Sequence, residues 1–189
     1  MKLTRTDIPG LLVVESAVFA DERGWFMESF NQPRWEAALA ALGEPVPPPF
    51  VQDNHSCSRA GVLRGLHYQL PPHAQGKLVR VVQGAAFDVA LDIRRGSPHF
   101  GRWCGIELSA ANRRQLWIPP GFAHAFIALE DDTHFLYKTT DVYAKDSERS
   151  IRWDDPALAI AWPLPKGISA PIVAPKDAAA PRFAEADLP

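Results

Sequence analysis

The chain has 189 residues, 47% of them hydrophobic, so it is long enough and apolar enough for one domain with a substantial core. A formal net charge of −2 and an isoelectric point near 6.3 argue against a basic surface for nucleic acid or an anionic membrane. Cys57 and Cys104 are too few for a disulfide framework, and no CxxC or Cys/His spacing indicates structural zinc.

The N-terminal residues predict short strands and no targeting segment. Asp7 and Glu15 interrupt the apolar residues before Phe19, so these residues lack the continuous hydrophobic run of a signal peptide or membrane span, and we expect a cytoplasmic protein. The alternation and turn residues that follow predict a strand, a turn and a second strand at residues 11–19, 21–24 and 25–30.

One helix is predicted next. Asn31 or Gln32 can cap it, Pro33 suits its first turn and Gly43 can end it. Its apolar positions follow the i, i+4, i+7 spacing of a buried helix face: Trp35, Leu39 and Leu42. A proline-rich loop at residues 44–49 separates this helix from the rest of the chain.

The remainder is a series of short strands. Turn residues separate candidates at 50–58, 62–68, 77–83, 86–94, 103–108, 115–118, 123–129 and 133–140. No helices alternate with them, so the fold class is all-β, a jelly-roll barrel with one or two short helices. We expect a single domain with its core at about residues 8–145, and a C-terminal extension, residues 146–189, whose apolar residues pack on the barrel.

The stretch Gly61–Gln69 concentrates unusual residues in one predicted strand. Arg64 and His67 are polar positions in an apolar run, and their spacing of three puts them on opposite faces of a regular strand unless Gly65 introduces a bulge. Either both enter one pocket at a kink, or only one does. A hydrogen-bonded core histidine is the plainer interpretation of His67, since one histidine is a weak catalytic signal.

A second histidine follows a tight turn. The run Pro119-Pro120-Gly121-Phe122-Ala123-His124 delivers His124 to the start of a strand, where it can face the same pocket. Small barrels often bind metal through such histidines, but a three- or four-ligand site needs an HxH pair or nearby carboxylates, and that pattern is absent. We therefore predict no metal site.

Several further runs resemble a known family, the dTDP-4-dehydrorhamnose 3,5-epimerases of the cupin superfamily. In chain order, the matching stretches are DERG (21–24), FVQDNHS (50–56), RGLHYQ (64–69), QGKLVR (75–80), FDVALDIR (87–94), QLWIP (115–119), GFAH (121–124), FLYK (135–138) and KDAAAP (176–181). The resemblance implies a cupin jelly roll, a homodimer, and an isomerase that needs no metal or other cofactor.

The implied reaction inverts C3 and C5 of dTDP-4-dehydro-6-deoxy-D-glucose to give dTDP-4-dehydro-L-rhamnose, in dTDP-L-rhamnose biosynthesis. Both carbons flank the C4 ketone, so each inversion needs a base, an oxyanion donor and an acid on the opposite face. By resemblance His67 is the base, Asp177 its carboxylate partner, Tyr137 the acid and Lys77 the oxyanion donor. A phenol needs a nearby cation to act readily as an acid, and we expect Lys77 or protonated His67 to supply it.

Nine further residues match the family's substrate-binding positions. The cations suited to the diphosphate are Arg23, Arg64 and Lys176. Gln52 and Asn54 are expected to hydrogen-bond sugar or base, Tyr143 to stack on thymine and His124 to orient the sugar; Glu28 and Glu148 match ligand-contacting carboxylates. Asp88 fits either a buried partner of one cation or a structural charge, and is left unassigned.

Three alternatives stay open. Relatives in the superfamily epimerise only C3 or only C5 of other dTDP sugars with much the same base and acid. A metal-dependent cupin would hold stoichiometric metal, and a non-catalytic sugar-nucleotide-binding cupin would bind dTDP but leave the substrate's protons in place.

Overall fold

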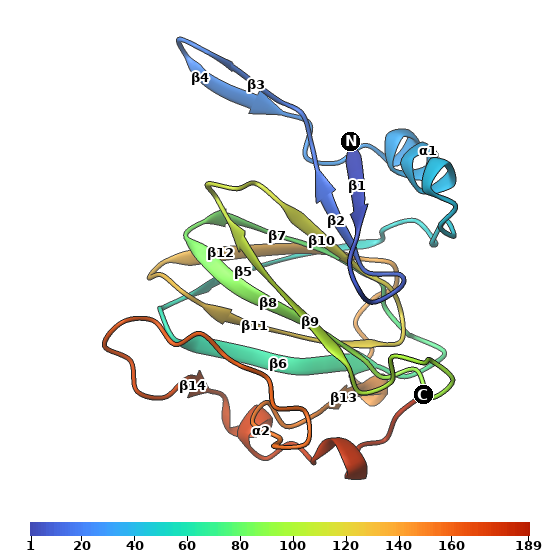
Figure 1. Ribbon diagram of the computed structural model, residues 1–189, viewed down its shortest axis with the longest axis vertical. Helices are drawn as coiled ribbons and strands as arrows, with labels where there is room; N and C mark the ends of the chain where they lie inside the picture. Colours follow the sequence, from blue (N-terminus) through green and yellow to red (C-terminus); the bar gives the residue numbers. More distant parts are fainter.

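The computed structural model describes all 189 residues and consists mainly of two antiparallel sheets that face each other (Figure 1). In spatial order the first sheet contains β1 (Lys2–Arg5), β2 (Leu12–Glu15), β10 (Gln115–Ile118), β7 (Lys77–Gln83), β12 (Thr133–Thr139) and β5 (Gln52–Ser58). The second contains β13 (Glu148–Ser150), β6 (Val62–Gln69), β11 (Phe122–Ala128), β8 (Ala85–Asp92) and β9 (Trp103–Ser109), and β14 (Ile172–Val173) pairs parallel to β6. The all-β jelly-roll prediction is confirmed.

The main core lies between the two sheets. Phe126 of β11 stacks on Phe135 of β12 with ring centroids 4.1 Å apart, which joins the sheets through an aromatic contact. β8 contributes only the small Ala86 and Ala90 to this cluster. The larger residues Val89 and Leu91 of β8, and Ile93 just after it, pack instead on the outer face of the second sheet.

The C-terminal extension explains why the large residues of β8 point outward. Leu158, Trp162 and Phe183 of the extension cover that outer face and bury it. The extension includes two 3₁₀ turns, η1 (Lys145–Ser147) and η2 (Phe183–Glu185), and the short helix α2 (Pro175–Ala178). Figure 1 shows it running back along β6, so α2 lies beside the strand that carries His67.

Helix α1 (Gln32–Leu42) covers part of the other sheet's outer face. Asn31 Oδ1 accepts a hydrogen bond from Arg34 N at 3.2 Å, and Gly43 ends the helix with a positive φ of 73°. Trp35 and Leu39 are fully buried, and Trp35 packs edge-on against Trp117 of β10. The predicted helix and both of its caps are confirmed.

The predicted strand at residues 11–19 is wrong as one element. The chain leaves the first sheet after Glu15 and continues as a separate hairpin of β3 (Val18–Asp21) and β4 (Gly24–Met27), which projects away from the barrel (Figure 1). The predicted turn at 21–24 lies at the tip of this hairpin, but the strand predicted at 25–30 ends at Met27. Strand β1 was not predicted, because its sequence, KLTR, has little apolar character.

Neither helix has the length and apolar content that a membrane-crossing segment needs.

Candidate active site

A bulge in β6 brings Arg64 and His67 to the same cavity. His67 lies opposite His124 and Arg64 lies opposite Phe126, so β6 uses three residue steps where β11 uses two. Gly65 has a φ of 123°, and a Cβ there would lie 2.5 Å from both Ala125 Cβ and His124 O. Only glycine fits this kink, and the first of the two arrangements expected for Arg64 and His67 is the one observed.

The ring of His67 is paired with a carboxylate from the far end of the chain. His67 Nε2 lies 2.7 Å from Asp177 Oδ1, and the backbone N–H of Gly65 donates to Asp177 Oδ2 at 3.2 Å. Asp177 is 2% exposed, whereas the His67 side chain is 26% exposed and open to the cavity. Burial alone would raise the pKa of Asp177, but the hydrogen bond and charge of His67 outweigh it and hold that pKa below its ordinary value.

The cavity between the sheets has a volume of about 510 Å³. It is large enough for a hexose ring and part of a diphosphate, and it is lined mostly by polar side chains. Nine of the predicted site residues line it: Asn54, Arg64, His67, Lys77, His124, Tyr137, Glu148, Lys176 and Asp177.

Lys77 is a buried cation in the wall of this cavity. It is 8% exposed, and its Nζ donates to the carbonyl of His67 at 3.4 Å. Burial lowers the pKa of Lys77 to about 8, against the opposing charges of Asp88 and Glu148. Below that pH an ammonium stands beside His67, out of bulk water, where it can stabilise a developing oxyanion.

His124 forms a second histidine–carboxylate pair beside the first. Its Nε2 lies 2.7 Å from Oδ2 of Asp88, which is fully buried, while Asp88 Oδ1 has no hydrogen-bond partner. Burial lowers the pKa of His124, and the nearby Lys77 and His67 lower it further, against the effect of Asp88. His124 is therefore a neutral ring that can hydrogen-bond a substrate.

Tyr137 reaches the cavity from the opposite sheet. It lies on β12, whereas both histidines lie on the second sheet, so a ligand between them has the phenol on one side and the imidazoles on the other. Burial raises the pKa of Tyr137, and the charges of Arg64 and Lys176 oppose that rise. The charges of Arg64 and Lys176 thus act on this phenol, and the expectation that Lys77 or protonated His67 assists it stays a prediction.

Glu148 and Lys176 line the cavity, and Tyr143 lies next to them without lining it. Glu148 accepts from Lys176 Nζ at 3.1 Å through Oε1 and from the Tyr143 hydroxyl at 3.1 Å through Oε2. These bonds and the charge of Lys176 keep the pKa of Glu148 below its ordinary value despite partial burial. The three residues offer a cation, a carboxylate and an exposed aromatic ring to one ligand.

Comparison with known proteins agrees with this geometry. The profile of the family described as dTDP-4-dehydrorhamnose 3,5-epimerase matches residues 5–185. The chain is 55% identical to the dTDP-4-dehydrorhamnose 3,5-epimerase of Pseudomonas aeruginosa and 54% identical to that of Shigella flexneri, each over 187 residues, 99% of this chain and 98% of the relative. The chain belongs to the dTDP-4-dehydrorhamnose 3,5-epimerase family.

A solved structure shows the same fold. The dTDP-6-deoxy-D-glucose-3,5-epimerase of Legionella pneumophila, crystallised with dTDP-4-keto-L-rhamnose, superposes with a TM-score of 0.90 at 49% identity, covering 97% of this chain and 93% of that one. The predicted activity, a carbohydrate epimerase of dTDP-L-rhamnose synthesis, is confirmed by these full-length relatives.

Four of the predicted binding residues of this epimerase do not line the cavity of their own chain: Arg23, Glu28, Gln52 and Tyr143. Arg23 lies at the hairpin tip, 83% exposed and paired with Asp21, and Glu28 pairs with Arg34 at 3.0 Å. Gln52 donates to Asn54 Oδ1 at 2.9 Å and accepts from the backbone of Tyr143. One N–H and one lone pair of the Gln52 amide are thus used by protein groups, and its contact with sugar or base stays a prediction.

Two residues that matter to the epimerase site were not assigned from the sequence. Asp88 fitted either a buried partner of one cation or a structural charge, and the sequence alone did not identify His124 as its partner. Gly65 N–H, the second donor to Asp177, is a backbone group that no sequence motif identifies. Nowhere in the chain do three or more His, Cys, Asp or Glu side chains gather in a group that could hold a metal ion.

Proposed function

We propose that His67, Asp177, Lys77 and Tyr137 carry out the epimerisation of C3 and C5 in dTDP-4-dehydro-6-deoxy-D-glucose. The observation that carries the proposal is the placement of a histidine–aspartate pair and a tyrosine on opposite sheets of one cavity, with a buried lysine beside the histidine. Loss of a proton alpha to the C4 ketone gives an enolate, and reprotonation from the other face inverts the carbon.

His67 is suited to remove the protons. Asp177 is ionised and can only accept a hydrogen bond, so it fixes the proton of the neutral imidazole on Nε2 and leaves Nδ1 as the basic nitrogen. After proton abstraction, the carboxylate stabilises the imidazolium at 2.7 Å. The pair thus provides both the tautomer and the charge that a general base needs.

Lys77 and Tyr137 complete the chemistry. The ammonium of Lys77 stabilises the negative charge that develops on the C4 oxygen, because it is already in place and shielded from bulk water. The phenol of Tyr137 delivers the new proton from the opposite sheet, and Arg64 and Lys176 stabilise the phenolate that forms. The same two cations are suited to bind the diphosphate, with Tyr143 against thymine and His124 against the sugar.

We also propose that the protein works as a homodimer in the cytoplasm. The β3–β4 hairpin exposes 65% of Phe19 and 68% of Phe26 and carries Arg23 away from the cavity of its own chain. A second copy of the chain would cover these rings and bring Arg23 and Glu28 to a ligand. A monomeric mass by light scattering at micromolar concentration would overturn this part of the proposal.

Incubation with dTDP-4-dehydro-6-deoxyglucose in deuterated water tests the reaction. We expect deuterium at both C3 and C5 by NMR, whereas deuterium at one carbon would indicate a restricted epimerase and none would refute the catalytic proposal. Tyr137→Phe should still exchange protons but turn over slowly or give the wrong stereochemistry, because the base remains and the acid does not. Full turnover with correct stereochemistry in this variant would remove Tyr137 from the mechanism.

A further inference from the structure

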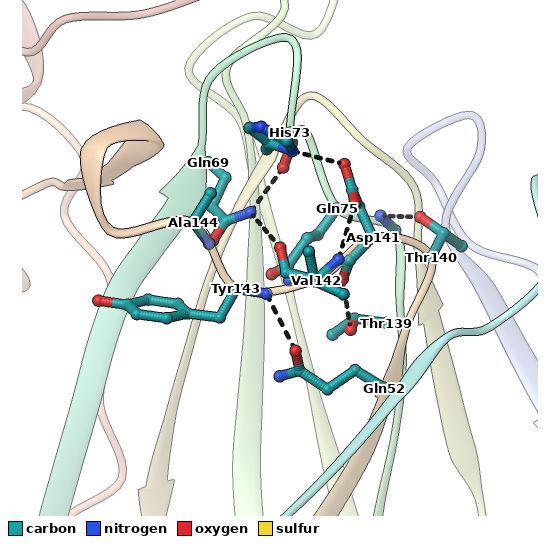
Figure 2. A network of polar contacts seen from close by, with 11 residues as sticks. Gln52, Gln69, His73, Gln75, Thr139, Thr140, Asp141, Val142, Tyr143 and Ala144 are labelled. Carbon is teal, nitrogen blue, oxygen red and sulfur yellow. Dashed lines mark hydrogen bonds and ion pairs between the residues drawn. The ribbon is translucent and has the colours of Figure 1, made fainter.

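The segment that carries Tyr143 leaves the barrel between β12 and η1 (Figure 2). The Tyr143 side chain points away from the network beneath it, and 53% of the residue is exposed. The only hydrogen bond of this side chain joins its hydroxyl to Glu148. Packing therefore does little to fix the ring. Its position depends on the backbone that carries it.

Two glutamines from different strands hold that backbone. Gln52 Oε1, at the start of β5, accepts from Tyr143 N at 2.9 Å. Gln69, at the end of β6, holds the residues on both sides: its Oε1 accepts from Ala144 N at 2.8 Å and its Nε2 donates to Val142 O at 3.2 Å. An amide side chain offers a donor and an acceptor, so glutamine can satisfy both kinds of backbone group in an irregular segment without adding charge.

The start of the segment is equally constrained. Asp141 O accepts from Gln75 Nε2 and from Thr139 Oγ1, each at 2.8 Å, and Asp141 Oδ1 accepts from Val142 N at 2.7 Å. The other carboxylate oxygen lies 3.1 Å from Nδ1 of His73. The backbone next to Tyr143 is thus tied to β5, β6 and the loop before β7.

Gln69 links this network directly to the catalytic strand. It is 7% exposed, lies opposite Glu148 in the sheet register and follows His67 by two positions on β6. Its Nε2 also donates to His73 O at 2.6 Å, so both atoms of its amide are occupied. One strand therefore carries the proposed base and holds the segment that presents the aromatic ring.

We propose that Gln52 and Gln69 are positioning residues that set the Tyr143 ring to receive the pyrimidine of a nucleoside diphosphate sugar. This rests on the proposed function, which places Tyr143 against thymine. The two glutamines hold the backbone that carries the ring, so the tightness of nucleotide binding depends on their bonds to residues 142–144.

The test measures binding of dTDP by titration calorimetry together with kcat and KM. Gln52→Ala removes one neutral hydrogen bond at a partly exposed site, so we expect Kd for dTDP and KM to rise about fivefold with kcat unchanged. Gln69→Glu keeps an oxygen that accepts from Ala144 N, but it replaces the donor to Val142 O with a second carboxylate oxygen. This variant should weaken dTDP binding at least as much as Gln52→Ala does. The control is Gln83→Ala, since Gln83 is exposed on β7 and its side chain forms no hydrogen bond.

A double-mutant cycle with Tyr143→Ala separates positioning from a general effect on folding. If the glutamine acts through the ring, Gln52→Ala in the Tyr143→Ala background should raise Kd by about twofold or less. An equal fivefold rise in both backgrounds, or a fall in kcat with Kd unchanged, would overturn the inference. Binding of dTDP does not need turnover. Failure of deuterium exchange in the wild type would therefore refute the catalytic proposal, whereas the Kd values for dTDP would still test the positioning role of the glutamines.

Discussion

Two histidine–aspartate pairs stand side by side in the cavity, on directly opposed residues of β6 and β11. In each, the histidine Nε2 lies 2.7 Å from a carboxylate oxygen, and each carboxylate is buried. They differ in exposure: the side chain of His67 is 26% exposed and that of His124 is 9% exposed. The same hydrogen bond thus occurs in two environments.

Burial decides what each pair can do. Transfer of a charged imidazolium out of water is costly, so the enclosed His124 stays neutral even beside Asp88, with Lys77 adding a repulsive cation. His67 has access to the cavity, and its carboxylate partner is held ionised by two donors. The first pair is therefore suited to carry protons and the second to bind.

Replacing the two histidines should give the largest contrast. We expect His67→Ala to lower kcat by about 10³-fold or more and to abolish deuterium incorporation at both carbons, because no other base stands at that position. His124→Gln keeps hydrogen-bonding capacity and should mainly raise KM, with kcat within about tenfold of wild type. Full activity in His67→Ala, followed by NMR of the substrate protons, would contradict the assignment.

Neutralising the two carboxylates should give a smaller contrast. Asp177→Asn removes the anion that stabilises the imidazolium and can favour the other tautomer, so we expect kcat to fall about 10²-fold. Asp88→Asn leaves a neutral His124 neutral and should lower kcat only a few fold at pH 7. Steady-state kinetics on both variants decides this, and equal losses would show that the pairs are not functionally distinct.

The pH profile gives a finer comparison. Lys77 stabilises an oxyanion only while protonated, so kcat should fall as the pH rises through its pKa of about 8. Asp88 raises that pKa by its charge, so in Asp88→Asn the alkaline limb should move to lower pH. The profile of kcat from pH 6 to 10 tests this. An unmoved limb would indicate that a group other than Lys77 controls it.

The smallest expected effect concerns the strand of His67. The Tyr68 hydroxyl donates to Asp187 O at 2.9 Å, with its pKa raised to about 12 by burial. Tyr68→Phe should lower the free energy of unfolding by about 1 kcal/mol in urea titration. We expect kcat to stay unchanged, because the bond anchors the extension away from the cavity; a matching loss of kcat would mean that it also positions Asp177.

The regular parts of the fold could be predicted because their signals are local. Asn31 and Gly43 mark the ends of α1, and turn residues separate the strands that alternate in hydrophobicity. The break at Ser16 and Ala17 was not predicted, because apolar residues with strand character lie on both sides of it and the departure of the hairpin from the sheet is a tertiary feature. The strand predicted at 86–94 is observed as β8 at nearly the same residues, but its large residues face the extension, a tertiary contact that the sequence pattern does not encode.

Knowledge of the site from the sequence depended on family motifs more than on spacing. The KDAAAP run identified Asp177, which spacing alone would have left as a surface residue 110 positions from His67. No motif distinguishes a glutamine that contacts ligand from one that binds backbone, so the bond of Gln52 to Tyr143 N could not be predicted, and its contact with substrate stays a prediction. Which cations stand beside Tyr137 also depended on side-chain packing across two sheets.

The docking of α2 on β6 has a consequence for biosynthesis. The ribosome adds Asp177 after every strand of the two facing sheets, so the barrel can assemble while the proposed base still lacks its counterion. A nascent or prematurely terminated chain would then hold a formed pocket in which no carboxylate orients the His67 ring. Full catalytic activity would require that α2 has been synthesised and has packed on β6.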